Sequence, residues 1–384
     1  MDTQDILMRI LASRICMQKP FDVPSLDEAA WQSLVALAKK QDLLHIVGDV
    51  LTSNRVQAVP DALAEKMQRE VFAAVYRYEK LNHAAKELYQ CLERAEIPFI
   101  PLKGAVIRAL YPEPWLRTSS DIDVLIHPED LARAEALLVS EKQYQKREKG
   151  PHDISFFALG NVHVELHYDL IEAGILDAAN NVLRDVWEHS APKEKGAFRH
   201  EMSDAFFYFY HIAHMAKHML HGGCGIRPVL DLWLLEHRLP QNAERDALLA
   251  NGGLLPFANA MRALAEAWFS GAVHSEQTLH LQEYLLYGGV YGNKENRVQM
   301  QNAKKGGRLR YACSRIFLPY DTLKFHYPVL QKHRWLTPFC EVRRWGKLLF
   351  CGGAKRSLDE LAINARIDRE QVEKTAAFLA EIGL

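Results

Sequence analysis

The segment Asp121-Ile122-Asp123 places two carboxylates two residues apart in an otherwise apolar stretch, between Thr118-Ser119-Ser120 and Val124-Leu125-Ile126. Side chains in a β-strand alternate between its faces, so both aspartates project from one face while Ile122 projects from the other. Two like charges held this close in a half-buried strand repel one another unless a cation neutralises them. Divalent cations with oxygen ligands, Mg²⁺ above all, meet that need. The segment therefore predicts a strand with a metal-binding face; an edge strand whose acids face water is the alternative.

A third carboxylate lies in a second strand-like segment, 162–167. Its apolar residues Val162, Val164 and Leu166 alternate with His163, Glu165 and His167. This period of two is typical of a half-buried strand, so a neighbouring strand can bring Glu165 beside the two aspartates. Three carboxylates from adjacent strands can hold two divalent ions, Mg²⁺ or Mn²⁺. Such ions activate an acceptor hydroxyl, grip a triphosphate and stabilise the charge that develops during its displacement.

A glycine turn precedes the acids. Residues 97–105, Ile-Pro-Phe-Ile-Pro-Leu-Lys-Gly-Ala, predict a short strand and a turn, followed by a helix over Val106–Leu110. A helix N-terminus offers free backbone N–H groups and a favourable dipole to phosphate. Lys103 and Arg117 flank the predicted pocket, where they can add charged contacts to a triphosphate. A Lys-Gly pair alone is weak evidence, and its significance comes from its order relative to the acids.

The order of these motifs resembles the nucleotidyltransferase superfamily of DNA polymerase β and kanamycin nucleotidyltransferase. In that superfamily a glycine motif opens a helix, a D-x-[DE] strand follows and a third acid lies on a later strand. One bacterial branch, the nucleotidyltransferase family proteins, is more similar still. The shared segments are Leu102-Lys103-Gly104, Leu110-Tyr111-Pro112, Leu116-Arg117, residues 120–126, Val164–His167, the His-x-x-Lys-His segment at 214–218 and Arg227-Pro-Val-Leu-Asp231. The resemblance covers roughly residues 25 to 345.

The resemblance implies transfer of a nucleoside monophosphate from an NTP to a hydroxyl-bearing acceptor, with release of pyrophosphate. Asp121, Asp123 and Glu165 would be the catalytic and metal-binding residues. The nucleotide phosphates would be held by Lys103, Gly104, Arg117, Ser119 and Ser120.

The chain departs from the superfamily at the turn, where Gly104-Ala105 replaces the usual Gly-Ser. The serine contact to phosphate must then come from elsewhere, with Ser119 and Ser120 as candidates. This departure motivates the rival hypothesis of a catalytically weak nucleotide-binding or interaction protein on a retained nucleotidyltransferase fold.

A helix is predicted from Ser203 through Leu220. Four histidines in this helix or directly after it share roughly one face: His211, His214, His218 and His221. This face either lines the active-site cleft or packs inside a helical bundle. A metal site at His214 and His218 lacks further local ligands. The candidates for acceptor binding across the cleft are His214, Lys217, Arg227 and Asp231. For Asp231, an ordinary helix carboxylate is the alternative.

The net charge of −1 argues against a general nucleic-acid-coating role. Two basic clusters with aromatic residues, at 304–315 and 343–347, can nevertheless hold an RNA backbone or stack a base. We therefore prefer a small-molecule or protein acceptor and keep RNA-directed transfer as an alternative.

The remaining features predict a cytoplasmic protein. Its six cysteines form no C-x-x-C pair and are expected to be reduced thiols: Cys16, Cys91, Cys224, Cys313, Cys340 and Cys351. No apolar run approaches the roughly 20 residues of a membrane span, so no membrane partner is expected. The N-terminal residues lack the basic start and apolar core of a signal peptide.

The predicted fold class is α+β, with a small mixed β-sheet nucleotidyltransferase core and helices, flanked by N-terminal and C-terminal helical regions. Four units are expected: a helical region at 1–95, the core at 96–195, a helical domain closing the cleft at 196–350, and a helix-turn-helix-like module at 355–384. Glu370 and Glu373 in the last helix oppose phosphate, so this module is expected to make protein or homo-oligomer contacts in preference to reading DNA.

Overall fold

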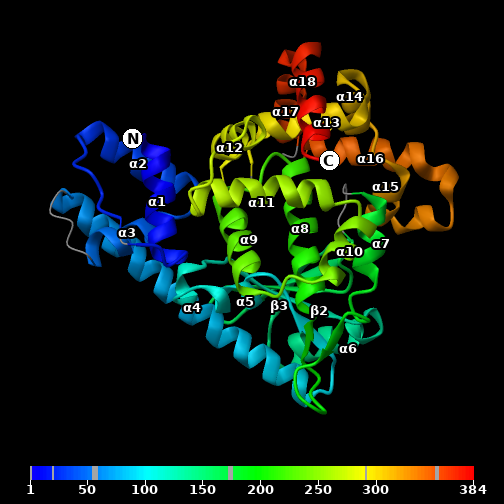
Figure 1. The fold of residues 1–384 in the computed structure, drawn as a ribbon. Helices are drawn as coiled ribbons and strands as arrows, with labels where there is room; N and C mark the ends of the chain where they lie inside the picture. The colour runs from blue at the N-terminus through cyan, green and yellow to red at the C-terminus, as the bar shows by residue number, and fades with distance from the viewer. Residues whose placement is uncertain (1, 20, 54–58, 172–175, 290–291, 351–353) are drawn as a thin grey trace.

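Five strands form a mixed sheet in the order β1-β2-β5-β4-β3. β1 (Phe99–Pro101) pairs antiparallel with β2 (Asp121–Ile126), and β2 pairs in parallel with β5 (Val162–His167). β4 (Asp153–Ala158) and β3 (Gln145–Lys149) extend the sheet in antiparallel pairs. The computed structural model describes residues 2–19, 21–53, 59–171, 176–289, 292–350 and 354–384. Helical segments come before and after the strands in the sequence, and together with the small mixed sheet they confirm the predicted α+β class (Figure 1).

One face of the sheet is apolar and packs on α4 (Asp61–Arg94) and α6 (Leu131–Ala136). Ile122 and Val164 of the sheet join Leu88 of α4 in this core. Because strand side chains alternate, burying Ile122 here turns both neighbouring aspartates to the opposite face. The apolar core therefore fixes the direction in which the acids point.

Three helices precede α4: α1 (Thr3–Ile15), α2 (Glu28–Lys40) and α3 (Leu44–Ser53). The side chains of Asp2 and Asp27 cap α1 and α2 by accepting the backbone N–H groups of Asp5 and Ala30, each at 2.8 Å. The apolar residues of these helices share one continuous core with helices from the middle of the chain. The N-terminal helices thus pack as part of the main body.

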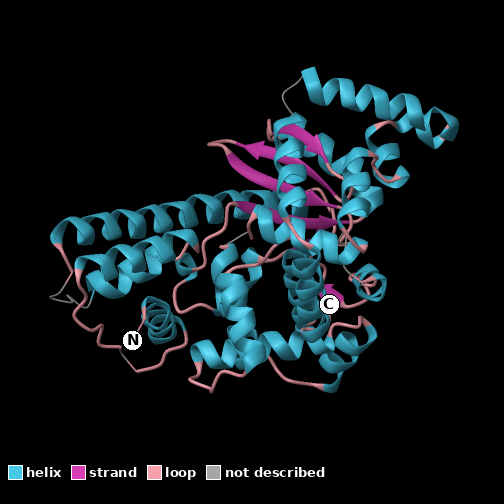
Figure 2. Ribbon diagram, turned by 90° about the horizontal axis from the view of Figure 1, so that it is seen from above, coloured by secondary structure: helices cyan, strands magenta, loops and turns pink. Residues whose placement is uncertain are grey.

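The middle of the chain is mainly helical. Its helices are α7 (Asp177–Arg184), α8 (Asp204–Leu220), α9 (Ile226–Arg238), α10 (Ala243–Asn251), α11 (Leu255–Phe269) and α12 (Glu276–Gly288). A short hairpin joins β6 (Ser190–Pro192) to β7 (His200–Met202). Ser203 caps α8, as its position before the aromatic run predicts. Figure 1 shows α8 and α9 running between α11 and the sheet, and Figure 2 shows that the strands gather in one part of an otherwise helical molecule.

In the described residues from 292 onward, the α-helices are α13 (Lys294–Lys305), α14 (Arg308–Ile316), α15 (Tyr320–His326), α16 (Thr337–Phe350), α17 (Ala354–Arg366) and α18 (Arg369–Glu381). The predicted helix pair at 355–384 corresponds to α17 and α18, which pack against α13. The five described cysteines are free, whereas Cys351 lies outside the described residues. Among the helices that the structure describes, none is both long and apolar enough to cross a membrane.

Candidate active site

The three predicted acids lie together on the polar face of β2 and β5. In the parallel register of these strands, Asp123 is opposite Glu165 and Asp121 is opposite His163. Two groups of side chains bring their ligand atoms within 4.8 Å of one another: Asp121, His163 and Glu165 form the first, and Asp123, Glu165 and His167 form the second. Glu165 belongs to both groups. The strand alternation and the strand pairing thus produce a compact cluster of carboxylates flanked by imidazoles.

Asp123 is the most buried of the three acids, with a side chain 6% exposed. Lys103 Nζ lies 3.1 Å from its Oδ1, and His167 Nε2 donates to the same oxygen at 2.9 Å. Burial alone raises the pKa of a carboxyl group, but Lys103 and His167 outweigh burial and hold the pKa of Asp123 well below its usual range. Burial likewise lowers the pKa of the His167 imidazole, and its hydrogen bonds to Asp123 and Glu165 more than reverse this, so the pKa is raised. Asp123 therefore remains ionised.

The pKa of Asp121 is shifted in the opposite direction. Its burial, followed by the negative charge of Asp123, raises the pKa of this carboxyl. The neighbouring negative charges are therefore only partly compensated by protein groups. Carboxylate oxygens within ligand distance of one another, with negative charge left over, are a donor set suited to a divalent cation. The residues present fit the metal that the sequence predicts.

The glycine turn follows β1 directly. Lys103 adopts a left-handed backbone conformation with φ of +45°, a strained state for a residue with a side chain, before α5 (Gly104–Ile107) begins. The predicted helix over Val106–Leu110 is in fact this single α-turn followed by a 3₁₀ turn over Arg108–Leu110. The expected dipole contribution is correspondingly small, because a helix dipole sums over many peptide units. The backbone N–H groups of Ala105, Val106 and Ile107 already donate to carbonyl oxygens of Leu102 and Lys103, so the charged group that this turn presents to the cavity is the Lys103 side chain.

Gly104 is closely packed. A Cβ atom added to Gly104 would lie 2.8 Å from Arg117 Nη1 and 3.4 Å from the Cβ of Ser119. Ser119 therefore lies beside the turn. Its Oγ accepts a hydrogen bond from Arg108 Nη2 at 2.8 Å, and Ser120 Oγ donates to Asp121 Oδ2 at 3.2 Å. Both predicted serines are next to the acids.

Arg117 and Asp231 form a buried ion pair. Arg117 Nη2 lies 2.9 Å from Asp231 Oδ2, Nε lies 3.3 Å from Oδ1, and the Tyr111 hydroxyl donates to Oδ1 at 2.7 Å. The Asp231 side chain has no exposed surface. Burial raises the pKa of this carboxyl, but the charge and hydrogen bonds of Arg117, with His211 and the Tyr111 hydrogen bond, together outweigh burial and lower it overall. The structure thus places two residues predicted to bind ligands, one a phosphate and the other an acceptor, in contact with each other.

Arg227 is held in a similar way. Its Nη1 lies 3.2 Å from Asp42 Oδ2 and donates to the Thr118 carbonyl oxygen at 2.9 Å. This contact ties the first turn of α9 to the segment that leads into β2. Arg117 and Arg227 therefore fix the loop before the acids, and both line the cavity described next.

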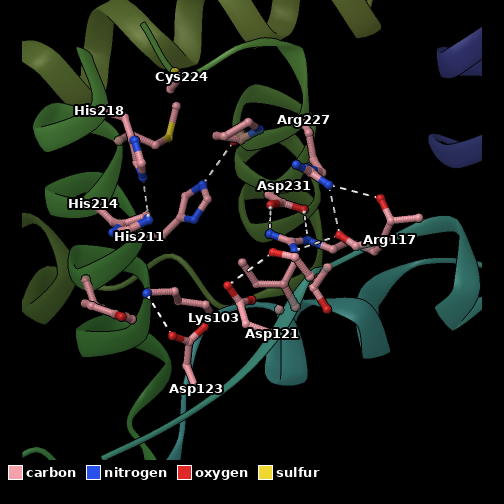
Figure 3. Close-up of a pocket in the computed structure, with 18 of the residues that line it drawn as sticks. Lys103, Arg117, Asp121, Asp123, His211, His214, His218, Cys224, Arg227 and Asp231 are labelled. Atoms are coloured by element: carbon pink, nitrogen blue, oxygen red, sulfur yellow. Dashed lines mark hydrogen bonds and ion pairs between the residues drawn. The ribbon is translucent and has the colours of Figure 1, made fainter. Parts of the chain in front are cut away.

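A cavity of about 510 Å³ lies above the acids, between the sheet and helices α8 and α9. Figure 3 shows Lys103, Asp121 and Asp123 on one side and His214 and His218 on the other. The Nε2 atoms of His214 and His218 are 2.9 Å apart, so one imidazole donates to the other. Lys217 also lines the cavity. The predicted acceptor residues of α8 thus lie across the cavity from the acids.

The other two histidines have structural partners. His211 donates through Nε2 to the Pro228 carbonyl oxygen at 3.0 Å, and His221 Nδ1 bonds to the Lys217 carbonyl oxygen at 2.7 Å. Burial lowers the pKa of both imidazoles, so both are neutral at physiological pH. On the histidine face of α8, His211, His214 and His218 line the cavity, whereas His221 is not among the lining residues.

Several residues of the site were not predicted from the sequence. His163 and His167 alternate with Glu165 in the strand pattern, and this spacing was a signal for their role in the cluster. Asp42 and Tyr111 had no such signal, because each meets its partner only through the tertiary fold. Arg77 of α4 is a further lining residue of this kind.

Comparison with known proteins agrees with this geometry. A family model described as "uncharacterised nucleotidyltransferase" matches residues 27–270, more than half of the chain. The matched range contains the glycine turn, all three acids and helices α8 and α9. Searches of curated proteins and of solved structures gave no match. The match confirms the resemblance seen in the motifs, and the chain belongs to this uncharacterised nucleotidyltransferase family.

Proposed function

We propose that the protein transfers a nucleoside monophosphate from an NTP to a hydroxyl-bearing acceptor, with release of pyrophosphate. The observation that carries this proposal is the cluster of Asp121, Asp123 and Glu165 on β2 and β5, at the floor of a cavity large enough for a nucleotide. Family membership supports transferase chemistry in general, and the proposal adds the three carboxylates as its catalytic residues.

Asp121, Asp123 and Glu165 would hold Mg²⁺ or Mn²⁺. When bound, a divalent ion supplies Lewis-acid stabilisation of the phosphate charge and lowers the pKa of a hydroxyl. The carboxylates orient the reacting groups relative to β2, and the buried side of the strand pair keeps their positions fixed. Lys103, which contacts Asp123 at 3.1 Å, is placed to neutralise either this acid or a phosphate oxygen in the same space.

The triphosphate would lie along the turn and the loop before β2. Gly104 permits close approach of the backbone, and Ser119 and Ser120 present hydroxyls next to it. Arg117 contributes positive charge to this side of the cavity, although Asp231 compensates much of it. The role of Arg117 is therefore mainly to position the loop, with a secondary electrostatic contribution to phosphate.

The acceptor would approach from the α8 side, where His214, Lys217 and His218 line the cavity. We favour a small molecule or a protein side chain as the acceptor. Arg227 and Asp231, which were also expected to contact it, act by fixing α9 to the loop before β2. Replacement of Lys217 by Ala should change the acceptor profile without abolishing NTP binding.

RNA is a second candidate acceptor, supported by one specific observation. Residues 304–350 contain 11 Lys and Arg residues but only two acids, Asp321 and Glu341. The same segment exposes the aromatic side chains of Phe317, Trp335 and Phe339, which are 56%, 69% and 67% exposed. Basic residues interspersed with exposed rings suit a single-stranded polynucleotide.

Calorimetry with each NTP and Mg²⁺ tests the nucleotide part of the proposal. We expect at least one NTP to bind, and binding to be lost when Asp121→Asn and Asp123→Asn are combined. If no NTP binds, or if the double variant binds equally well, the proposal is wrong. Nucleotide binding without pyrophosphate release across a broad acceptor panel would instead favour a nucleotide-binding protein that has lost catalysis.

The acceptor class is tested with labelled NTPs and a cell extract, followed by separation of small molecules, protein and RNA. Label in small molecules or protein is the expected result. Label confined to RNA would contradict the preferred acceptor class and would assign a function to the basic segment at 304–350.

A further inference from the structure

Each possible metal site in the carboxylate cluster contains an imidazole. His163 accompanies Asp121 and Glu165, and His167 accompanies Asp123 and Glu165. The histidines alternate with Glu165 on β5, so all three side chains leave the strand on the face that carries the two aspartates of β2. The polar face therefore offers nitrogen as well as oxygen ligands.

Both imidazoles lie beside the carboxylates. The Nε2 atom of His167 lies 2.9 Å from Asp123 Oδ1 and 3.4 Å from Glu165 Oε2. His163 Nε2 is hydrogen-bonded to Ser155 Oγ at 2.5 Å and lies 3.9 Å from Glu165 Oε1. The ring of His163 also stacks on Phe157, with centroids 5.1 Å apart, which restricts its rotation. Both histidines are thus held beside the acids by packing and hydrogen bonds.

Nitrogen ligands discriminate between divalent metal ions. Mg²⁺ is a hard ion that is bound mainly by carboxylates, phosphates and water. Imidazole suits first-row transition metals, which also accept carboxylate oxygen. A site with two carboxylates and one imidazole should consequently bind a transition metal more tightly than Mg²⁺.

We propose that the cluster of Asp121, Asp123, Glu165, His163 and His167 binds a divalent first-row transition metal in preference to Mg²⁺, with at least one β5 imidazole as a ligand. This inference rests on the proposed function for the identity of the site and adds the class of metal that it takes. His167 donates its Nε2–H to Asp123 when no metal is bound, and ligation through this nitrogen would release that proton to solvent.

The test uses the full chain, stripped of metal with a chelator and kept free of nucleotide. Mn²⁺ is titrated and followed by electron paramagnetic resonance of the free ion, and Mg²⁺ is added as a competitor. The variants are His163→Gln, His167→Gln and the double variant, because glutamine retains a donor for hydrogen bonding but removes the imidazole nitrogen. His83→Gln is the matched control, since its side chain on α4 is 78% exposed.

We expect Mn²⁺ to bind the unmodified protein at least about 10-fold more tightly than Mg²⁺. The double variant should lose at least about 10-fold in Mn²⁺ affinity, because loss of a partner outside the ligand shell already costs about 10- to 100-fold, with a much smaller change in Mg²⁺ affinity. The inference is overturned if the two ions bind equally, or if the glutamine variants weaken both ions to the same degree. Circular dichroism checks folding, and His163→Gln alone carries the test if His167→Gln does not fold.

The result separates this inference from the proposed function. Equal binding of Mn²⁺ and Mg²⁺ together with NTP-dependent pyrophosphate release would overturn the metal preference and leave the function in place. A preference for Mn²⁺ that is lost in the histidine variants, without NTP binding in either metal, would support the metal site and contradict the nucleotidyl transfer proposal.

Discussion

Arg117 and Asp231 join the floor of the cavity to its helical wall through two hydrogen bonds, with Nη2 to Oδ2 at 2.9 Å and Nε to Oδ1 at 3.3 Å. Arg117 precedes β2, whereas Asp231 belongs to α9. Their contact therefore sets the position of the loop before the acids relative to α8 and α9. The carboxylate has no exposed surface and the arginine side chain is only 13% exposed, so neither charge can be solvated if the other is removed.

Replacement Asp231→Asn should destabilise the fold strongly. Asparagine keeps the size of the side chain but leaves Arg117 with an uncompensated buried charge, which typically costs about 3–5 kcal/mol. Urea unfolding at neutral pH measures the loss. Asp359→Asn is the matched control, because its ion pair with Lys294 is about half exposed and contributes at most about 1 kcal/mol. Equal losses in the two variants would contradict a structural role for the Arg117–Asp231 pair.

The same pair predicts how stability changes with pH. Burial raises the pKa of Asp231 in the folded protein, but Arg117, His211 and Tyr111 together outweigh burial and lower it overall. A carboxyl with a lowered folded pKa stabilises the fold above its unfolded pKa of about 3.9, and the contribution is lost as the pH falls toward the folded pKa. The stability difference between the unmodified protein and Asp231→Asn should therefore be constant near neutral pH and shrink below about pH 4. Unfolding titrations from about pH 7 to about pH 3 check this, and a pH-independent difference would oppose it.

Replacement Gly104→Ala should weaken nucleotide binding with the fold retained. The added Cβ would lie 2.8 Å from Arg117 Nη1, so the guanidinium, which Asp231 holds in place, must shift away from the turn. We expect NTP affinity to fall about 10-fold, equivalent to about 1.4 kcal/mol. The control Gly346→Ala adds a Cβ in α16 with no atom within 4 Å, and there the affinity should remain unchanged. Unaltered NTP affinity in Gly104→Ala would show that the turn does not contact the nucleotide.

Local sequence patterns predicted the parts of the site that depend on strand geometry. The period of two in 162–167 and the spacing of Asp121 and Asp123 determine which side chains share a face, and the structure places them together. The start of α8 is similarly determined locally, because the Ser203 hydroxyl caps the helix by accepting the backbone N–H of Phe206, three residues later.

Contacts between distant segments could not be predicted in this way. The sequence identified Arg117 and Arg227 as positive charges near the pocket but gave no information on the carboxylates that hold them. Their partners, Asp231 and Asp42, are 114 and 185 residues away in the sequence, and the packing of the shared core brings them together. The helix predicted over 106–110 in fact begins at Gly104 and changes to a 3₁₀ turn at Arg108, whose Nε donates to the Gly104 carbonyl oxygen at 2.8 Å.

The most direct test of nucleotidyl transfer by Asp121, Asp123 and Glu165 follows two products of one reaction. The protein is incubated with each NTP labelled at the α-phosphate, divalent metal and cell extract, and both pyrophosphate and transferred label are quantified. We predict equal amounts of both products from the unmodified protein and from the control Asp246→Asn, whose side chain is 64% exposed. Asp123→Asn should lower both by about 100-fold or more, as loss of a key electrostatic contact does. Undiminished transfer by Asp123→Asn, or no transfer by the unmodified protein with any NTP, would contradict the proposed function.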